Sequence, residues 1–190
     1  FFNDYKNLTG QCTLSGGCTG SSADRQYNGG QAWLYGAEAV AGDTLLLPTD
    51  GDLSFSLSYA WTRTQFRTSF YSEFPQFGDV VVGDSLPYVP EHQGGATVGW
   101  IHPTWEINLG ATARSGMLDE AGSFPISQTD VPALLLLDAG ARIHLKDQLY
   151  LYTTATNLTG ATTITSWRPM GARPTAPFQV MVGLKLDPTE

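Results

Sequence analysis

Residues 53–61 read Leu-Ser-Phe-Ser-Leu-Ser-Tyr-Ala-Trp, and this stretch decides the fold class. Every odd position carries a large apolar side chain, whereas Ser54, Ser56, Ser58 and Ala60 fill the even positions. Successive side chains of a β-strand point to opposite faces, so the segment predicts a strand with one apolar face and one small, polar face. A strand of a soluble sandwich also alternates, so one strand alone does not choose between architectures.

The same alternation recurs along the chain in long segments. Together with 53–65, the predicted strands span 1–8, 31–40, 88–101, 105–114, 133–145, 148–157 and 178–186. Repeated alternation in long segments is typical of a barrel wall with lipid outside and a polar interior. The sequence therefore predicts an all-β chain that forms an antiparallel transmembrane β-barrel segment of about eight strands.

The connections between the predicted strands are of two kinds. Three are short or moderate, and they centre on Asp50-Gly51, His102-Pro103 and Lys146-Asp147. Four are long, and they span 9–28, 66–87, 115–132 and 158–177. Outer-membrane barrels have short turns at one rim and long loops at the other. We therefore expect the loops containing Cys12, Phe77, Gly122 and Arg168 to share one end, opposite the short turns.

Charged residues within the predicted strands follow the polar face. Examples are Glu106, Arg114, Asp138 and Arg142. A basic residue on a lipid face costs about 2–4 kcal/mol near the membrane midplane, so we expect mid-strand charges on the polar face only. Aromatic residues gather near strand ends, as they do in the girdles at membrane interfaces.

The composition agrees with many strands joined by turns. The 190 residues include 21 Gly, and only 15% are charged. No stretch approaches the roughly 18 consecutive apolar residues that a membrane helix needs. The net charge of −8, without any basic run, excludes a nucleic acid as partner, because nothing would neutralise its phosphates.

Both cysteines of the chain, Cys12 and Cys18, lie in the first long loop. Their spacing fits a small loop closed by a disulfide, which implies an oxidising compartment; two free thiols are the alternative. Because no cluster of histidines stands near them, we expect no metal site there.

No set of residues resembles an active site, so the sequence predicts neither enzyme activity nor a cofactor. The three histidines are scattered, and no Ser, His and acid set has catalytic spacing. Asp138, Arg142 and His144 share one face of a predicted strand, where a water-facing structural ladder inside a barrel accounts for them.

Several segments, in the expected order and covering essentially all of 1–190, resemble the C-terminal barrel of TonB-dependent outer-membrane receptors, most closely the ferric-citrate-receptor-like branch. They are Phe2-Asn3-Asp4-Tyr5-Lys6-Asn7-Leu8, Asn28-Gly29-Gly30-Gln31-Ala32, Tyr35-Gly36-Ala37-Glu38, Gly83-Asp84-Ser85-Leu86-Pro87-Tyr88-Val89-Pro90-Glu91-His92-Gln93, Asn157-Leu158-Thr159 and Arg168-Pro169-Met170-Gly171-Ala172-Arg173-Pro174. The segment from Gly83 to Gln93 is the most specific of them.

The resemblance implies the C-terminal part of a 22-stranded barrel in the outer membrane of a Gram-negative bacterium. The plug domain that fills such a barrel and carries the TonB-contacting segment is absent from this chain. The implied function is TonB-dependent transport of a ferric chelate, of the siderophore or citrate type. The alternative is a self-contained eight-stranded barrel with a structural or adhesive role, but the small residues of the polar face would fill a narrow interior badly.

The family also suggests cationic loop residues that meet an anionic ferric chelate. Arginine forms bidentate hydrogen bonds with carboxylates, and Arg67, Arg168 and Arg173 are the loop-borne candidates. The alternative for Arg168 and Arg173 is that they hold their own Pro- and Gly-rich loop in place.

Overall fold

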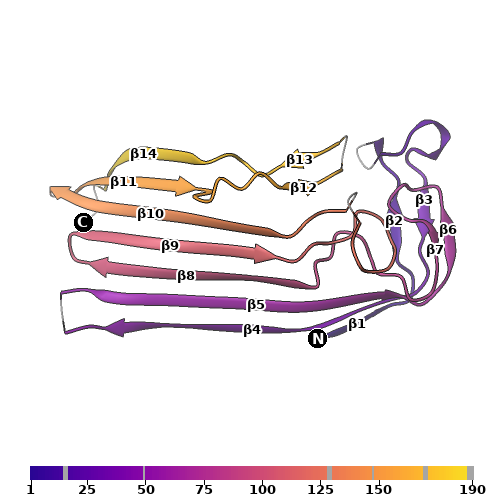
Figure 1. Ribbon diagram of the computed structural model, residues 1–190, viewed down its shortest axis with the longest axis horizontal. Coiled ribbons are helices and arrows are strands. Elements are labelled where there is room, and N and C mark those ends of the chain that lie inside the picture. Colours follow the sequence, from indigo (N-terminus) through magenta and orange to yellow (C-terminus); the bar gives the residue numbers. More distant parts are fainter. Residues whose placement is uncertain (15–16, 49, 128–129, 147, 169–170, 188–190) are drawn as a thin grey trace.

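One antiparallel sheet dominates the computed structural model, which describes residues 1–14, 17–48, 50–127, 130–146, 148–168 and 171–187. Eight strands lie side by side in the order of the chain (Figure 1). They are β1 (Phe2–Tyr5), β4 (Ala32–Leu46), β5 (Asp52–Phe66), β8 (His92–His102), β9 (Trp105–Arg114), β10 (Leu134–Lys146), β11 (Leu149–Thr156) and β14 (Gln179–Leu186). The predicted all-β, eight-stranded antiparallel wall is confirmed, with β1 and β14 at its two edges.

One strand boundary differs clearly from the prediction. Gly42 and Asp43 suggested a turn, yet β4 continues to Leu46 and pairs with β5 as far as Asp52. The partner strand supplies backbone hydrogen bonds over the full 15 residues of β4, and these outweigh the weak β-propensity of glycine and aspartate. At the loop end of the wall one strand is shorter than predicted, because the strand expected from position 88 begins only at His92. Tyr88 has a positive φ of 60°, which interrupts the extended backbone.

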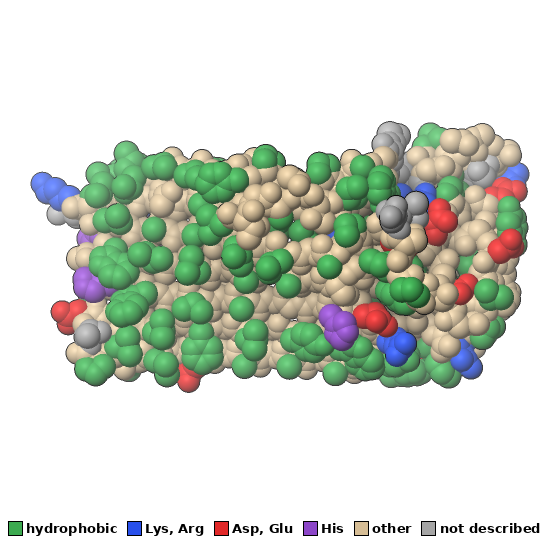
Figure 2. All heavy atoms as spheres, viewed as in Figure 1, with side chains coloured by type: hydrophobic (Ala, Val, Ile, Leu, Met, Phe, Trp, Pro, Cys, Tyr) green, Lys and Arg blue, Asp and Glu red, His purple; other side chains and the backbone are tan. Residues whose placement is uncertain are grey.

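The two faces of the sheet differ as the alternation predicted. On the apolar face, Leu57 pairs with Ala96 and Phe55 pairs with Val98. On the polar face, the Ser56 and Thr97 hydroxyls are 2.6 Å apart. Large apolar side chains stay exposed, with Leu57 at 54%, and Figure 2 shows hydrophobic side chains spread over the strands. A soluble sandwich would bury these side chains under a second sheet, so their exposure favours a wall that faces lipid.

The mid-strand charges lie on the polar face, as predicted, and Glu106 pairs there with Arg142. Other charged residues, near strand ends, lie on the apolar face. Asp4 pairs with Trp33, Asp43 pairs with Phe55, and Arg63 pairs with Tyr35. Each lies within three residues of the end of its strand, and the hydrocarbon penalty for a charge falls steeply toward the interfaces.

The long loops contain small hairpins that the alternation did not predict. They are formed by β2 (Thr9–Gln11) with β3 (Gln26–Asn28), β6 (Phe70–Ser72) with β7 (Gly78–Val80), and β12 (Ile164–Ser166) with β13 (Arg173–Pro174); a 3-10 helix, η2 (Gly20–Ser22), lies in the first loop. All three hairpins lie at one end of the sheet, away from the short turns, so the expected separation of loops and turns is confirmed (Figure 1).

The most buried apolar residues also lie at this loop end. Ala32, Phe66 and Val80 are 0–3% exposed, and Phe70 and Phe77 pack around them. The start of β4 and the end of β5 thus share a small core with the β6–β7 hairpin. This core fixes the loops on the wall, whereas the wall itself has its apolar side chains outside. No helix in the described ranges is long and apolar enough to cross a membrane.

Candidate functional site at the loop end

Four long connections meet at the loop end, and we name them loop A (6–31), loop B (67–91), loop C (115–133) and loop D (157–178). Segments of loops B and C continue the wall beyond its strands. The Ser85 amide donates to the Gly122 carbonyl at 2.6 Å, and the Met117 amide donates to the Val131 carbonyl at 2.9 Å. Loops B and C are therefore joined by backbone hydrogen bonds before any side chain is considered.

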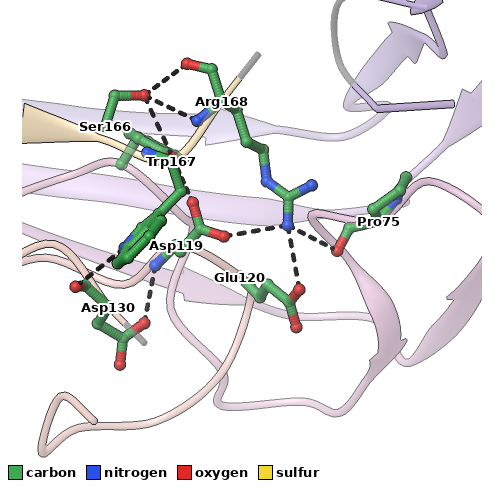
Figure 3. A network of polar contacts seen from close by, with 8 residues as sticks. Pro75, Asp119, Glu120, Asp130, Ser166, Trp167 and Arg168 are labelled. Carbon is green, nitrogen blue, oxygen red and sulfur yellow. Dashed lines mark hydrogen bonds and ion pairs between the residues drawn. The ribbon is translucent and has the colours of Figure 1, made fainter. Parts of the chain in front are cut away.

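Arg168 of loop D is the centre of a polar network between these loops (Figure 3). Its Nη2 lies 3.0 Å from Asp119 Oδ2 and 3.0 Å from Glu120 Oε1, both in loop C. The same nitrogen donates to the Pro75 carbonyl of loop B at 3.4 Å. A Cβ atom added to Gly17 of loop A would lie 3.4 Å from Arg168 Nη1, so loop A passes close to the guanidinium. One guanidinium thus bonds loops B and C to its own loop D and lies beside loop A, and its side chain is only 18% exposed.

Tyr88 of loop B completes the network on the other oxygen of the aspartate. Its hydroxyl donates to Asp119 Oδ1 and accepts a hydrogen bond from the Trp167 amide at 3.1 Å. Burial raises the pKa of the Tyr88 hydroxyl, and the hydrogen bond to Asp119 raises it further. The phenol therefore stays protonated and remains a donor to the carboxylate.

A second aspartate, Asp130, joins loops C and D. Its Oδ1 accepts from the Asp119 amide at 2.8 Å, and its carbonyl accepts from Trp167 Nε1 at 3.2 Å. We call Tyr88, Asp119, Asp130, Trp167 and Arg168 the loop junction. Its five residues come from loops B, C and D. Each of them makes a hydrogen bond or an ion pair with a residue of another of these loops.

Asn157 anchors the start of loop D. Its side chain is 3% exposed, and its backbone has a left-handed φ of 53°. The side-chain amide donates to the carbonyls of Ala161 and Ala176 at 2.9 and 2.8 Å, and its oxygen accepts from the Ala161 amide at 2.9 Å. Asparagine suits the position because it tolerates left-handed backbone and bonds nearby main chain.

The predicted disulfide is confirmed, since Cys12 and Cys18 are bonded to each other in loop A. Both are buried, and Phe74 of loop B completes their cluster, with Tyr27 stacked on Phe74 at 5.3 Å. Burial raises the pKa of the Tyr27 hydroxyl. The disulfide closes a small ring within loop A, and the packing of this ring and Tyr27 on Phe74 holds loop A against the β6–β7 hairpin.

The structure does not bring the three predicted arginines together. Arg168 is surrounded by protein carboxylates, which agrees with the holding role left open for it, although it holds neighbouring loops as well as its own. Arg173 lies exposed on β13, and it makes none of the ion pairs found in the described part of the chain. Arg67 continues the apolar face of β5, with its guanidinium carbon 4.1 Å from the centroid of the Trp33 ring.

Sequence reasoning missed the partners of Arg168. The adjacent acids Asp119 and Glu120 were visible in a predicted long loop, in the same set of loops as Arg168. Opposite charges in loops at one rim were the available signal. Within the described residues there is no group of three or more His, Cys, Asp or Glu side chains that could hold a metal ion.

The comparisons with known proteins agree with this arrangement. The family described as TonB dependent receptor-like, beta-barrel matches residues 1–158. The chain belongs to this family. Among solved structures, the siderophore receptor PiuA from Acinetobacter baumannii is similar in fold, with a TM-score of 0.68 at 14% sequence identity. The match covers 96% of this chain and 24% of that receptor. No curated protein sequence matches the chain.

A wall segment of a larger receptor barrel thus accounts for the sheet. The family membership confirms the predicted resemblance to a TonB-dependent receptor, and the similarity of fold to the solved receptor covers nearly the whole chain. The chain spans about a quarter of the length of the solved receptor.

Proposed function

We propose that residues 1–190 form part of the barrel wall and four external loops of an outer-membrane receptor that imports a ferric chelate. The chelate is of the siderophore or citrate type, and the import is driven through TonB by way of a plug domain that lies outside this chain. Membership of the TonB-dependent receptor family supports the receptor role and the outer membrane of a Gram-negative bacterium as its location. Transport, and not catalysis, is the activity that this family membership favours.

The loop junction is the observation that carries the proposal. A ligand that enters from outside meets the loops first, and four loops held in fixed positions can present a preorganised surface to it. Arg168 forms ion pairs with Asp119 and Glu120, so these charged groups position the loops. Arg173, on the same loop and exposed, is the cation that remains to meet an anionic chelate.

The edges of the sheet favour a wide barrel over the self-contained alternative. A closed eight-stranded barrel requires β1 to pair with β14. In the described residues, β1 pairs with β4 and β14 pairs with β11. Two open edges in lipid would leave backbone groups without partners, so further strands of a longer chain are the natural neighbours of both edges.

The decisive experiment is chelate binding by the intact receptor with single loop substitutions. Arg173→Gln should weaken binding of a ferric, carboxylate-rich chelate about tenfold or more, because a charge-assisted hydrogen bond contributes roughly 1.5–3 kcal/mol. Arg25→Gln is the matched control, since Arg25 is a loop-borne arginine whose exposed side chain lies 3.9 Å from Glu73. Tryptophan fluorescence quenching reports the affinity.

The outcomes separate the parts of the proposal. An intact receptor that binds no ferric chelate would remove the transport function itself. Equal chelate affinity in wild type and Arg173→Gln would show that Arg173 does not contact the ligand. That result would not contradict the transport function. Arg67→Gln and Arg168→Gln, measured in the same way, test the two remaining predicted ligand contacts.

A further inference from the structure

Loops A and B enclose a small hollow at the far end of the loops, where Figure 1 places the β2–β3 and β6–β7 hairpins. It measures about 290 Å³ and is lined by residues of β3, by residues of β6 and by the turn that follows β6. None of the loop-junction residues and none of the three predicted ligand-contacting arginines lines it. The hollow is therefore separate from the groups to which the chelate route has been assigned.

One wall of the hollow is aromatic and held in place by packing. Tyr27 stacks on Phe74 with their ring centroids 5.3 Å apart, and Phe77 lies 5.0 Å from Tyr27 and 5.5 Å from Phe74. Cys12, fixed by the disulfide, packs in the same buried cluster. This wall is preorganised, because its rings are held by one another. Tyr71 also lines the hollow and is 70% exposed, so it offers a second ring that a ligand can cover.

The polar groups around the hollow carry no net charge. Arg25 of loop A and Glu73 of loop B lie 3.9 Å apart, so their charges balance. Gln26 and Asn28 are exposed, and their amides project from the same face of β3. The Asn28 side-chain oxygen accepts from the Gly30 amide at 2.8 Å, which leaves the amide nitrogen as a donor. The hollow thus places neutral hydrogen-bonding groups next to aromatic rings.

This combination selects a neutral ring that bears hydroxyl groups. The balanced ion pair gives no net attraction for a phosphate or a carboxylate, and the described residues hold no cluster of metal ligands. A purely apolar ligand would leave the amides without partners, which costs free energy. We infer that the hollow binds one pyranose unit of a neutral saccharide on the outside of the cell.

A pyranose matches both kinds of wall. When its hydroxyls are equatorial, as in the gluco configuration, one face of the ring presents C–H groups that lie against the negative face of an aromatic ring. The hydroxyls at the edge of the sugar can then exchange hydrogen bonds with the amides of Gln26 and Asn28. A volume of about 290 Å³ accommodates one such ring but not a longer saccharide.

An extended peptide is the other class of ligand that could reach β3, because in the described sheets this strand pairs only with β2. β3 has only three residues, so an added strand would gain few backbone hydrogen bonds. Such a ligand would also use the backbone of β3 and not the side chains of Gln26 and Tyr71. These two side chains therefore distinguish a saccharide from a peptide.

The hollow is assigned from the external position that the proposed function gives the loops, and not from chelate transport. The test uses the intact receptor in a detergent without a sugar headgroup, with methyl β-D-glucopyranoside as the probe and sorbitol, an open-chain polyol, as the comparison. Titrations followed by saturation-transfer-difference NMR measure the affinity. Tyr71→Ala and Gln26→Ala should each weaken glucoside binding about three- to tenfold, and sorbitol should not bind.

Two further variants provide controls. Tyr71→Phe keeps the ring and should keep the affinity for the glucoside, which separates stacking from an effect on folding. Val82→Ala, at a 53% exposed position of loop B outside the hollow, should also bind the glucoside as wild type does. Heat-resistant migration of the barrel on gels checks that every variant is folded.

Four results would overturn the inference. The first is equal glucoside affinity in wild type and the Tyr71→Ala, Gln26→Ala double variant, and the second is equal binding of sorbitol. The third is displacement of the glucoside by excess ferric chelate, which would make the hollow part of the chelate route. The fourth is a receptor that ignores the glucoside but binds an extended Thr-Val hexapeptide, which would assign the open side of β3 to a peptide partner. Chelate binding by the wild-type receptor shows separately whether the transport proposal fails.

Discussion

Removing the Arg168 guanidinium should free the external loops without unfolding the wall. Arg168→Gln breaks two ion pairs of 3.0 Å and leaves the Asp119 carboxylate, 12% exposed, without its cation. A hydrogen bond to a charged, buried group contributes roughly 1.5–3 kcal/mol. The pair with Glu120, whose side chain is 64% exposed, adds about 0–1 kcal/mol. We therefore expect loop opening to become easier by about 2–4 kcal/mol, or roughly 30-fold to several-hundred-fold.

Hydrogen–deuterium exchange of the intact receptor measures this change directly. The Trp167 amide, bonded to the Tyr88 hydroxyl, and the Asp119 amide, bonded to Asp130, should exchange faster by that factor. Amides of β9 and β10 should keep their rates, because their backbone bonds do not involve the loop junction. Local opening differs from global unfolding in this way.

Arg173→Gln is the matched control for this experiment. It removes the same charge from the same loop, at an exposed position on β13. If both variants exchange alike, or if loop exchange changes less than about threefold in Arg168→Gln, the loop junction does not hold the loops and the reasoning fails.

Three further predictions concern the wall, the tyrosine and the base of loop D. Leu57→Lys puts a charge on the apolar face and should destabilise the barrel by about 2–4 kcal/mol in a refolding titration, whereas Ser56→Lys, on the polar face, should be nearly neutral. The Tyr88 hydroxyl has a raised pKa, so its contribution is fully present below its ordinary pKa of 10.0 and is lost as pH rises through the raised value; tyrosinate absorbance, compared with Tyr88→Phe, should show a late-titrating group. Asn157→Ala should weaken the base of loop D by about 1–3 kcal/mol, seen as faster proteolysis there; an unchanged rate would show that its four side-chain hydrogen bonds are dispensable.

The structure inside the long loops could not be predicted from the sequence. The hairpin of β6 and β7 is only three residues on each strand, too short for alternation to reveal. It forms because Phe70 and Phe77 of the hairpin region pack on Phe66, at the end of β5, and bury its apolar ring. Likewise, Gly42 and Asp43 have turn-like propensities, but the length of the partner strand overrides them.

The residues by themselves determined the wall, and only the tertiary structure decided the site. Alternation is a local property, since neighbouring side chains of a strand always point to opposite faces, so the strands and their faces could be predicted from 53–61 outward. The contact between Arg168 and Asp119 joins residues 49 positions apart. Arg67 was expected among the ligand-contacting residues of the loops, but its side chain continues the apolar face of β5 and stacks on Trp33. Which loop residues meet depends on strand register and on how the hairpins pack at the rim, and no local pattern carries that information.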